Sequence, residues 1–132
     1  MIDKYKDVLL NSKLIVSQLK VPVDVSNYLI NFCHENNLPI IVTPCNPDKL
    51  SLDLIDKISI ITANQKECEA IFDTTNIEEC ITKYPNKLIV TLGKDGVIYH
   101  DGTSVVKLPA ILNYIFNKNL AEIKICKVFL LL

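Results

Sequence analysis

Apolar segments with two different periods alternate along most of the chain, and this alternation constrains the fold more than any other feature. Compact runs rich in β-branched residues occur at residues 14–17, 39–43, 58–62 and 87–91. They lack polar alternation, which is typical of strands buried on both faces of a parallel sheet. Residues 23–36 instead carry apolar side chains at steps of three and four, as in an amphipathic helix. Strands joined by helices form right-handed βαβ units, so the sequence predicts an α/β fold.

The remaining segments complete a mainly parallel sheet with flanking helices. We predict further helices over residues 2–10, 50–55, 65–72 and 77–84. After residue 91 the alternation of strands and helices stops. Two short apolar runs, 97–99 and 105–108, follow turns at 93–96 and 100–102 instead. These runs predict an antiparallel hairpin at the edge of the sheet.

Length, charge and cysteine content narrow the class of protein. A chain of 132 residues forms one core, because chains divide into separate cores only beyond about 250 residues. The net charge of -1 provides no field that would attract nucleic acid. The first residues lack the apolar core of a secretion signal, and no stretch approaches the ~20 apolar residues of a membrane span. The five cysteines include no C-x-x-C pair, so we expect reduced, mostly buried thiols in a cytoplasmic protein.

Polar residues at the end of the third predicted strand form the first candidate site. Thr62-Ala63-Asn64-Gln65-Lys66-Glu67 places an amide and a carboxylate three residues apart at a helix start. Taken alone, this pattern is best explained as a capping box, in which Asn64 is the N-cap and Glu67 reaches back. Ligands of parallel sheets nevertheless collect at the carboxyl ends of strands, where helix N-termini favour anions. Phosphate binding is therefore the functional alternative for this segment.

The second candidate follows the fourth predicted strand, at Thr91-Leu92-Gly93-Lys94-Asp95-Gly96. Its two glycines permit positive φ or a close approach of backbone to a ligand. On local grounds a plain hairpin turn is the stronger interpretation. We assign no role to Lys94 or Asp95.

Taken together and in this order, the two segments resemble the T-x-N-x-x-E and T-L-G-x-x-G motifs of the ribokinase-like (PfkB) carbohydrate kinases. The resemblance implies the nucleotide-binding, C-terminal part of an ATP-dependent sugar kinase, which transfers the γ-phosphoryl group of ATP to a sugar hydroxyl. It implies that Asn64 and Glu67 orient the nucleotide phosphates and hydrated Mg²⁺, with Glu67 acting on the metal through water. It also implies that Thr91, Gly93 and Gly96 line the ATP site.

The resemblance has a boundary, which divides the chain into a partial ribokinase-like α/β domain at residues 1–108 and an apolar tail at 109–132. After the edge hairpin the family shows D-T-x-G-A-G-D, whose last aspartate deprotonates the sugar hydroxyl. Residues 109–132 contain neither glycine nor aspartate. We therefore assign no catalytic residue and expect no turnover from this chain alone.

The sequence leaves two alternatives to the sugar kinase. One is a non-catalytic nucleotide-binding or interaction module on the same platform, with the apolar tail buried against a second copy or a partner chain. The other is a Rossmann dehydrogenase, which requires G-x-G-x-x-G at a helix start, and that motif is absent. Nucleotide, and with it a sugar, are thus the expected ligands.

Overall fold

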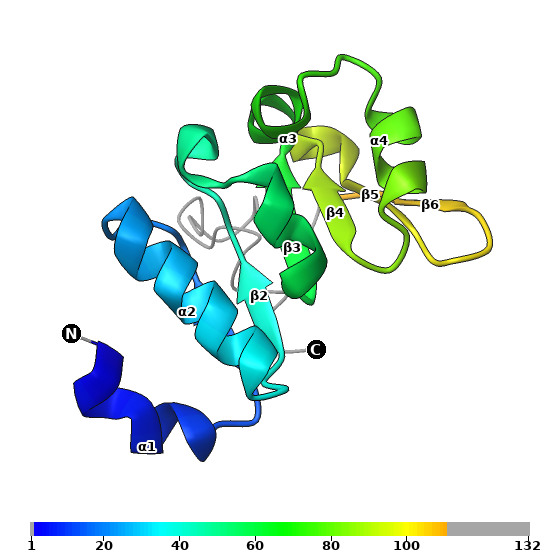
Figure 1. The fold of residues 1–132 in the computed structure, drawn as a ribbon. Helices are drawn as coiled ribbons and strands as arrows, with labels where there is room; N and C mark the ends of the chain where they lie inside the picture. Colours follow the sequence, from blue (N-terminus) through cyan, green and yellow to red (C-terminus); the bar gives the residue numbers. More distant parts are fainter. Residues whose placement is uncertain (1, 111–132) are drawn as a thin grey trace, which may run out of the picture.

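The computed structural model describes residues 2–110, which form a six-stranded sheet flanked by helices (Figure 1). The strands lie side by side in chain order, with β1 to β4 parallel and β5 and β6 antiparallel at one edge. They are β1 (Ile15–Ser17), β2 (Ile40–Val42), β3 (Ile60–Asn64), β4 (Leu88–Thr91), β5 (Val97–His100) and β6 (Val105–Leu108). The predicted α/β class and the antiparallel edge hairpin are confirmed.

Every helix predicted within residues 2–110 is present. The α-helices are α1 (Lys6–Leu10), α2 (Val23–Glu35), α3 (Gln65–Phe72) and α4 (Ile77–Lys83). The 3-10 helices are η1 (Ile2–Tyr5), η2 (Pro47–Lys49), η3 (Leu52–Lys57) and η4 (Gly93–Asp95). The predicted opening helix is therefore divided into η1 and α1, and the predicted 93–96 turn contains one short 3-10 turn. Each of these helices is too short or too polar to cross a bilayer.

The order of the strands places the connecting helices on one face of the sheet. Each right-handed crossover between neighbouring parallel strands leaves its helix on the same side when the strands follow in sequence order. In Figure 1, α2 and α4 both lie on the viewer's side of the sheet. Alternating burial in β2 agrees with this arrangement, since Ile40 and Val42 are fully buried whereas Ile41 is only partly buried.

The expectation that these strands are buried on both faces is wrong for the described part of the chain. Val16 in β1 is 44% exposed, its register partner Ile41 in β2 is only partly buried, and so is Ile60, the partner of Ile41 in β3. No helix within residues 2–110 that connects the parallel strands covers this second face, because all of the crossovers turn to the other side. We call the face of the sheet that carries Val16, Ile41, Ile60 and Ile89 the open face.

The core lies between the sheet and its helices. It includes residues from α2, η3, α3, α4 and the inward side of the strands. Members that are fully or almost fully buried are Ile30, Cys33, Ile40, Val42, Ile55, Ile58, Ile61, Cys68, Ile81, Leu88 and Val90. Burying one such aliphatic side chain stabilises a fold by about 1.5–3 kcal/mol. This core fixes α3 and α4 against β3, β4 and β5, and it thereby positions the carboxyl ends of those strands.

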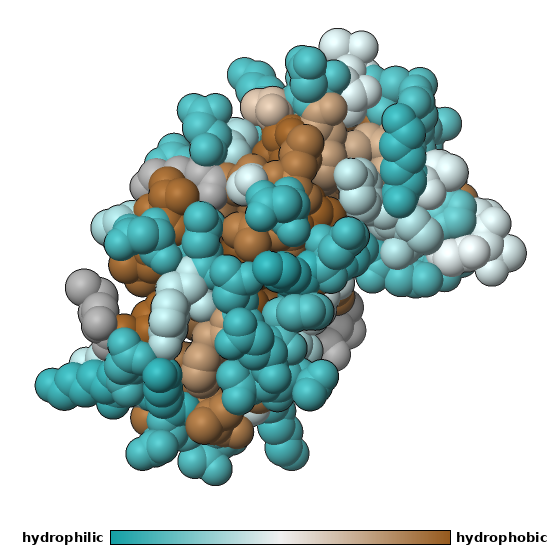
Figure 2. Space-filling view, viewed as in Figure 1, coloured by the Kyte–Doolittle hydropathy of each residue, from teal (hydrophilic) through white to brown (hydrophobic). Residues whose placement is uncertain are grey.

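The helix-covered side is mostly hydrophilic on its outside. Figure 2 shows hydrophilic residues over much of this view and an apolar patch at the start of α2. Val21 and Val23, at that start, are 40% and 43% exposed. Isolated exposed apolar residues are normal on protein surfaces, so this patch by itself indicates no function.

Candidate functional site at the carboxyl edge of the sheet

Asn64 ends β3 and is also the N-cap of α3. Its backbone is extended, with φ -80° and ψ 171°, so its side chain turns back over the first helical turn. Asn64 Oδ1 accepts a hydrogen bond from the Glu67 backbone N–H at 2.9 Å. Glu67 Oε2 in turn accepts one from the Asn64 backbone N–H, also at 2.9 Å. The capping box expected from the sequence is therefore formed, which is why α3 begins where it does.

Some polar atoms at the start of α3 remain available to a ligand after the capping box has formed. Only one carboxylate oxygen of Glu67 is used in it, and Oε1 has no partner among the described residues. The side chain is partly buried rather than enclosed. The N–H groups of the first helical residues also have no partner within their own helix, which concentrates partial positive charge at this end. Capping and an outer-sphere contact to a metal ion are thus compatible roles for Glu67.

Thr91 brings the second motif beside the first. Thr91 ends β4 and is the direct register partner of Asn64 across the parallel β3–β4 pair. Its hydroxyl donates to the Ala63 carbonyl oxygen over a long 3.5 Å. Because both strands are parallel, their carboxyl ends meet at one edge of the sheet, and both motifs lie there.

The two glycines of the second motif face different surroundings. Gly93 has φ +60°, and a Cβ placed there would meet nothing within 4 Å, so the turn is open on that side. Gly96 has φ +92°, and its Cβ would lie 1.9 Å from the Leu108 carbonyl oxygen and 2.7 Å from the Ala110 nitrogen. Glycine at 96 is thus required by the chain's own packing, whereas glycine at 93 leaves room for a ligand to approach the backbone.

A pair of threonines near this edge was missed by sequence reasoning. The Thr43 and Thr62 hydroxyl oxygens are hydrogen bonded at 2.8 Å, across the loop after β2 and the body of β3. Both side chains are partly buried. The available signal was the presence of threonine in or just after two apolar strands, but the pairing itself depends on the register of β2 and β3. The hydroxyls of Thr43, Thr62 and Thr91 therefore lie near this edge together with the Glu67 carboxylate.

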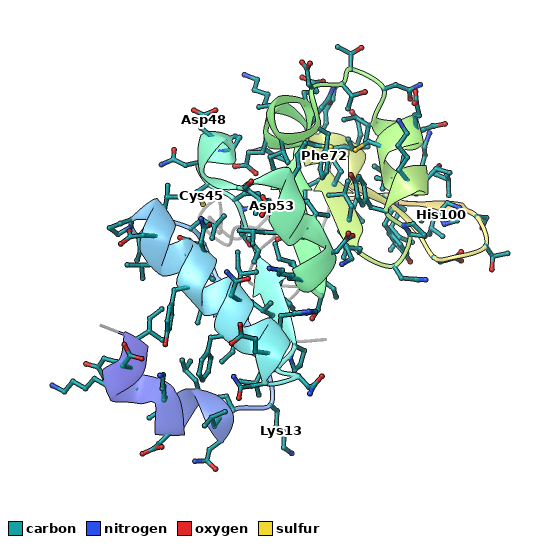
Figure 3. All side chains as sticks on the ribbon, in the orientation of Figure 1. Lys13, Cys45, Asp48, Asp53, Phe72 and His100 are labelled. Carbon is teal, nitrogen blue, oxygen red and sulfur yellow. The ribbon has the colours of Figure 1, made fainter. Side chains whose placement is uncertain are left out.

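The remaining polar residues singled out from the sequence lie elsewhere or have ordinary roles. In Figure 3, Cys45 lies near the carboxyl edge, whereas His100 lies away from it beside the hairpin. His100 Nδ1 accepts a hydrogen bond from the Gly102 backbone N–H at 3.0 Å, as expected of a turn residue. His34 is exposed near the end of α2. Within residues 2–110, no group of three or more His, Cys, Asp or Glu side chains is arranged to hold a metal ion.

A cavity of about 400 Å³ lies at the opposite edge of the sheet and includes Lys87 and Lys57 in its lining. Lys87 Nζ donates to three backbone carbonyl oxygens at the end of η3, at 2.9, 3.1 and 2.6 Å. Burial lowers the pKa of Lys87. Since its three N–H donors are all used by the chain itself, Lys87 holds η3 in place and is not available to bind an anion.

The fold is shared with solved sugar kinases. Arabidopsis thaliana ribokinase, determined in complex with ribose and ATP, superimposes with a TM-score of 0.71 at 18% sequence identity. That match covers 84% of this chain and 39% of the ribokinase. Halothermothrix orenii fructokinase gives a TM-score of 0.63 at 19% identity, covering 81% of this chain and 45% of that enzyme.

Sequence relatives point to the same family. Over 100 residues the chain is 40% identical to a ribokinase of Lactococcus lactis, covering 76% of this chain and 33% of the relative. Over 97 residues it is 31% identical to a ribokinase of Bacillus subtilis, covering 74% and 33% respectively. The chain thus spans about a third of the length of the curated relatives it matches. The family model for pfkB family carbohydrate kinases matches residues 4–114, which is most of the sequence. This chain therefore belongs to the pfkB family of carbohydrate kinases.

Proposed function

We propose that the carboxyl edge of β3 and β4 binds Mg-ATP, and that the chain is the nucleotide-binding part of an ATP-dependent sugar kinase of the ribokinase type. The observation that carries this proposal is the register pairing of Asn64 with Thr91, which brings the two motifs together at one edge. Family membership and the ATP complex of the Arabidopsis relative give it further support.

The residues at this edge suit a triphosphate. The N-terminus of α3 offers backbone N–H groups and positive partial charge to phosphate oxygens. Glu67 keeps one carboxylate oxygen for the water shell of Mg²⁺, an ion that usually retains several waters beside one or two carboxylates. Thr91 supplies a hydroxyl, and the open side of Gly93 admits close approach to the backbone. Bound Mg-ATP would supply the transferable γ-phosphoryl group, with the metal offsetting its negative charge.

The proposal for this chain alone covers nucleotide binding and not phosphoryl transfer to a sugar. Phosphoryl transfer to a sugar hydroxyl needs a base in reach of that hydroxyl, and residues 109–132 offer no aspartate. That segment, apart from its first two residues, lies outside the described residues. The chain spans about a third of the length of the ribokinases that it matches. We propose that the chain alone binds Mg-ATP without sugar-dependent turnover.

Calorimetric titration of Mg-ATP tests the nucleotide site. We expect Asn64→Ala and Glu67→Gln each to weaken binding by roughly tenfold or more, which corresponds to about 1.4 kcal/mol. Loss of the N-cap costs Asn64→Ala about 1 kcal/mol of folding stability, to be measured by urea denaturation. Glu67→Gln keeps a side-chain oxygen that accepts from the Asn64 N–H, so its stability should change less. Asn76→Ala is the matched control, since Asn76 Oδ1 caps α4 by accepting from the Glu79 backbone N–H at 3.1 Å.

The control separates a nucleotide site from a simple helix cap. Asn76→Ala should lose similar stability and retain wild-type affinity for Mg-ATP. If all three variants bind Mg-ATP equally, Asn64 and Glu67 serve only as caps and the proposed site is wrong. Formation of ADP that depends on added sugar would contradict the proposed lack of turnover and would require a base other than the family aspartate.

The open face favours a second candidate function, that of a non-catalytic interaction module. A parallel sheet is normally covered on both faces, and Val16, Ile41, Ile60 and Ile89 present β-branched apolar side chains there. The occupant we propose is a partner chain that supplies helices to this face. Absence of Mg-ATP binding together with a larger sedimenting species in the presence of that partner would favour this function over the first.

A further inference from the structure

The sulfur atoms of Cys68 in α3 and Cys80 in α4 face each other across the helix pair. Their Sγ atoms are 4.0 Å apart, and the residues are 0% and 4% exposed. Of the four cysteines within residues 2–110, these two alone form such a sulfur contact. A disulfide requires a sulfur separation of about 2.05 Å, so an approach of about 2 Å would join them.

A cavity gives one of the two thiols a route to small molecules. It has a volume of about 130 Å³ and is lined by Cys80 together with Phe72, Tyr84, Glu79, Lys83 and two further residues. Phe72, labelled in Figure 3, marks its position at the α3 end. A water molecule occupies about 30 Å³ in the liquid, so this cavity accommodates a molecule as small as hydrogen peroxide.

The surroundings distinguish the two thiols. The hydrogen bond from Cys68 lowers the pKa of the Cys80 thiol, burial opposes this, and the nearby charges act in both directions, Lys83 lowering the pKa and Glu79 raising it. Lys83 is held beside the cavity by its ion pair with Glu79, at 2.8 Å. Because the thiolate is the nucleophilic form of cysteine, Cys80 is the better placed of the two to react first.

We propose that Cys68 and Cys80 form a redox-active dithiol, which a hydroperoxide converts into a disulfide that links α3 to α4. The Cys80 thiolate attacks the peroxide, so that an S–O bond forms, the O–O bond breaks and hydroxide leaves. The Cys68 sulfur then displaces hydroxide from the Cys80 sulfenic acid, and the departing oxygen takes the Cys68 proton and leaves as water. Overall, two thiols lose two electrons and hydrogen peroxide is reduced to two waters.

The disulfide would also affect the edge described above. Asn64 and Glu67 lie at the start of α3, and Cys68 is the next residue in that helix. A disulfide between α3 and α4 would restrict the movement of α3, which carries these residues. The thiol chemistry itself does not depend on nucleotide binding, so either proposal can fail without the other.

Peptide mapping of the full 132-residue chain tests the dithiol directly. Lys66 and Lys83 are consecutive tryptic sites, so Cys68 and Cys80 fall on one peptide, residues 67–83. The folded protein is treated with hydrogen peroxide, alkylated under denaturing conditions and digested. We expect this peptide to lose both alkyl groups and to weigh about 2 Da less than its unalkylated dithiol form, with full recovery after a dithiol reductant. The peptide of residues 21–49, which carries Cys33 and Cys45, shows whether peroxide reached the protein.

Two variants test the order of the steps. In Cys68→Ser, the Cys80 sulfenic acid has no resolving thiol, and we expect dimedone to label Cys80. In Cys80→Ser, we expect Cys68 to remain unlabelled. Cys33→Ser, which removes another fully buried thiol, is the matched control and should leave the 67–83 peptide able to form its disulfide. The proposal is overturned if peroxide oxidises the exposed Cys45 while the wild-type 67–83 peptide keeps two alkyl groups.

Discussion

Replacing Gly96 by alanine should destabilise the chain far more than the same replacement at Gly93. Gly96 has φ +92° and ψ -132°, close to a backbone region that is essentially limited to glycine, and holding alanine there costs about 1–3 kcal/mol. The added methyl would also overlap the Leu108 carbonyl oxygen at 1.9 Å, and overpacking of this kind costs typically about 1–3 kcal/mol. The two effects together amount to about 4 kcal/mol.

Gly93→Ala isolates the backbone contribution. Its φ of +60° is left-handed, which costs an alanine roughly 1 kcal/mol, and the new methyl would meet no atom within 4 Å. The expected difference between the variants is therefore about 3 kcal/mol. With a urea m-value of about 1–3 kcal/mol/M, the Gly96→Ala midpoint should lie at least about 1 M below that of Gly93→Ala.

Urea denaturation followed by far-UV circular dichroism measures both midpoints on the same chain. A Gly96→Ala midpoint close to that of Gly93→Ala would refute the reasoning. It would mean that the segment after β6 moves away from the turn without cost, and that its contact with Gly96 does not hold the hairpin against β4.

Two further predictions concern stability. Lys87→Met removes the donor that three backbone carbonyl oxygens at the end of η3 share. Because these acceptors lose their partner, the free energy of unfolding measured by urea denaturation should fall by about 2–3 kcal/mol. Lys87→Arg should retain part of that stability. Backbone N–H groups of Ser104 and Thr103 lower the pKa of Asp101 in the hairpin turn. The stabilising contribution of the Asp101 carboxylate to the folded state is therefore fully present above its ordinary pKa of 3.8. It is lost as the pH falls through the lowered pKa of the folded state. A pH series of melts should show this acid-dependent loss for the wild type and its absence in Asp101→Asn; equal pH dependence of the two would contradict it.

Local sequence signals located most of the secondary structure. The helix predicted at residues 65–72 is observed with the same bounds, because its N-cap and its first-turn carboxylate lie within three residues of each other. The third strand was predicted at residues 58–62 and is found at Ile60–Asn64. The Ile58 N–H donates to the Ile55 carbonyl oxygen, so Ile58 ends the last turn of η3 although its backbone is already extended, and the paired strand begins after it.

Burial on the second sheet face was not determined by the local pattern. A β-branched run without polar alternation looks the same whether one face or both are covered. The order β1-β2-β3-β4, combined with right-handed crossovers, places all of the connecting helices of the described chain on one side. That order is a long-range property, which a single strand's residues do not encode.

By itself, the sequence determined the α/β class, the edge hairpin, the cap at Asn64 and the family resemblance, because periodicity, caps and motifs are local. Only the tertiary structure decided that Asn64 lies beside Thr91, that Gly96 packs against the end of β6 and that Cys68 meets Cys80. Each of these contacts joins segments at least twelve residues apart in the chain. They depend on strand order, register and helix packing, and those are chosen by the burial of the whole core rather than by any local run of residues.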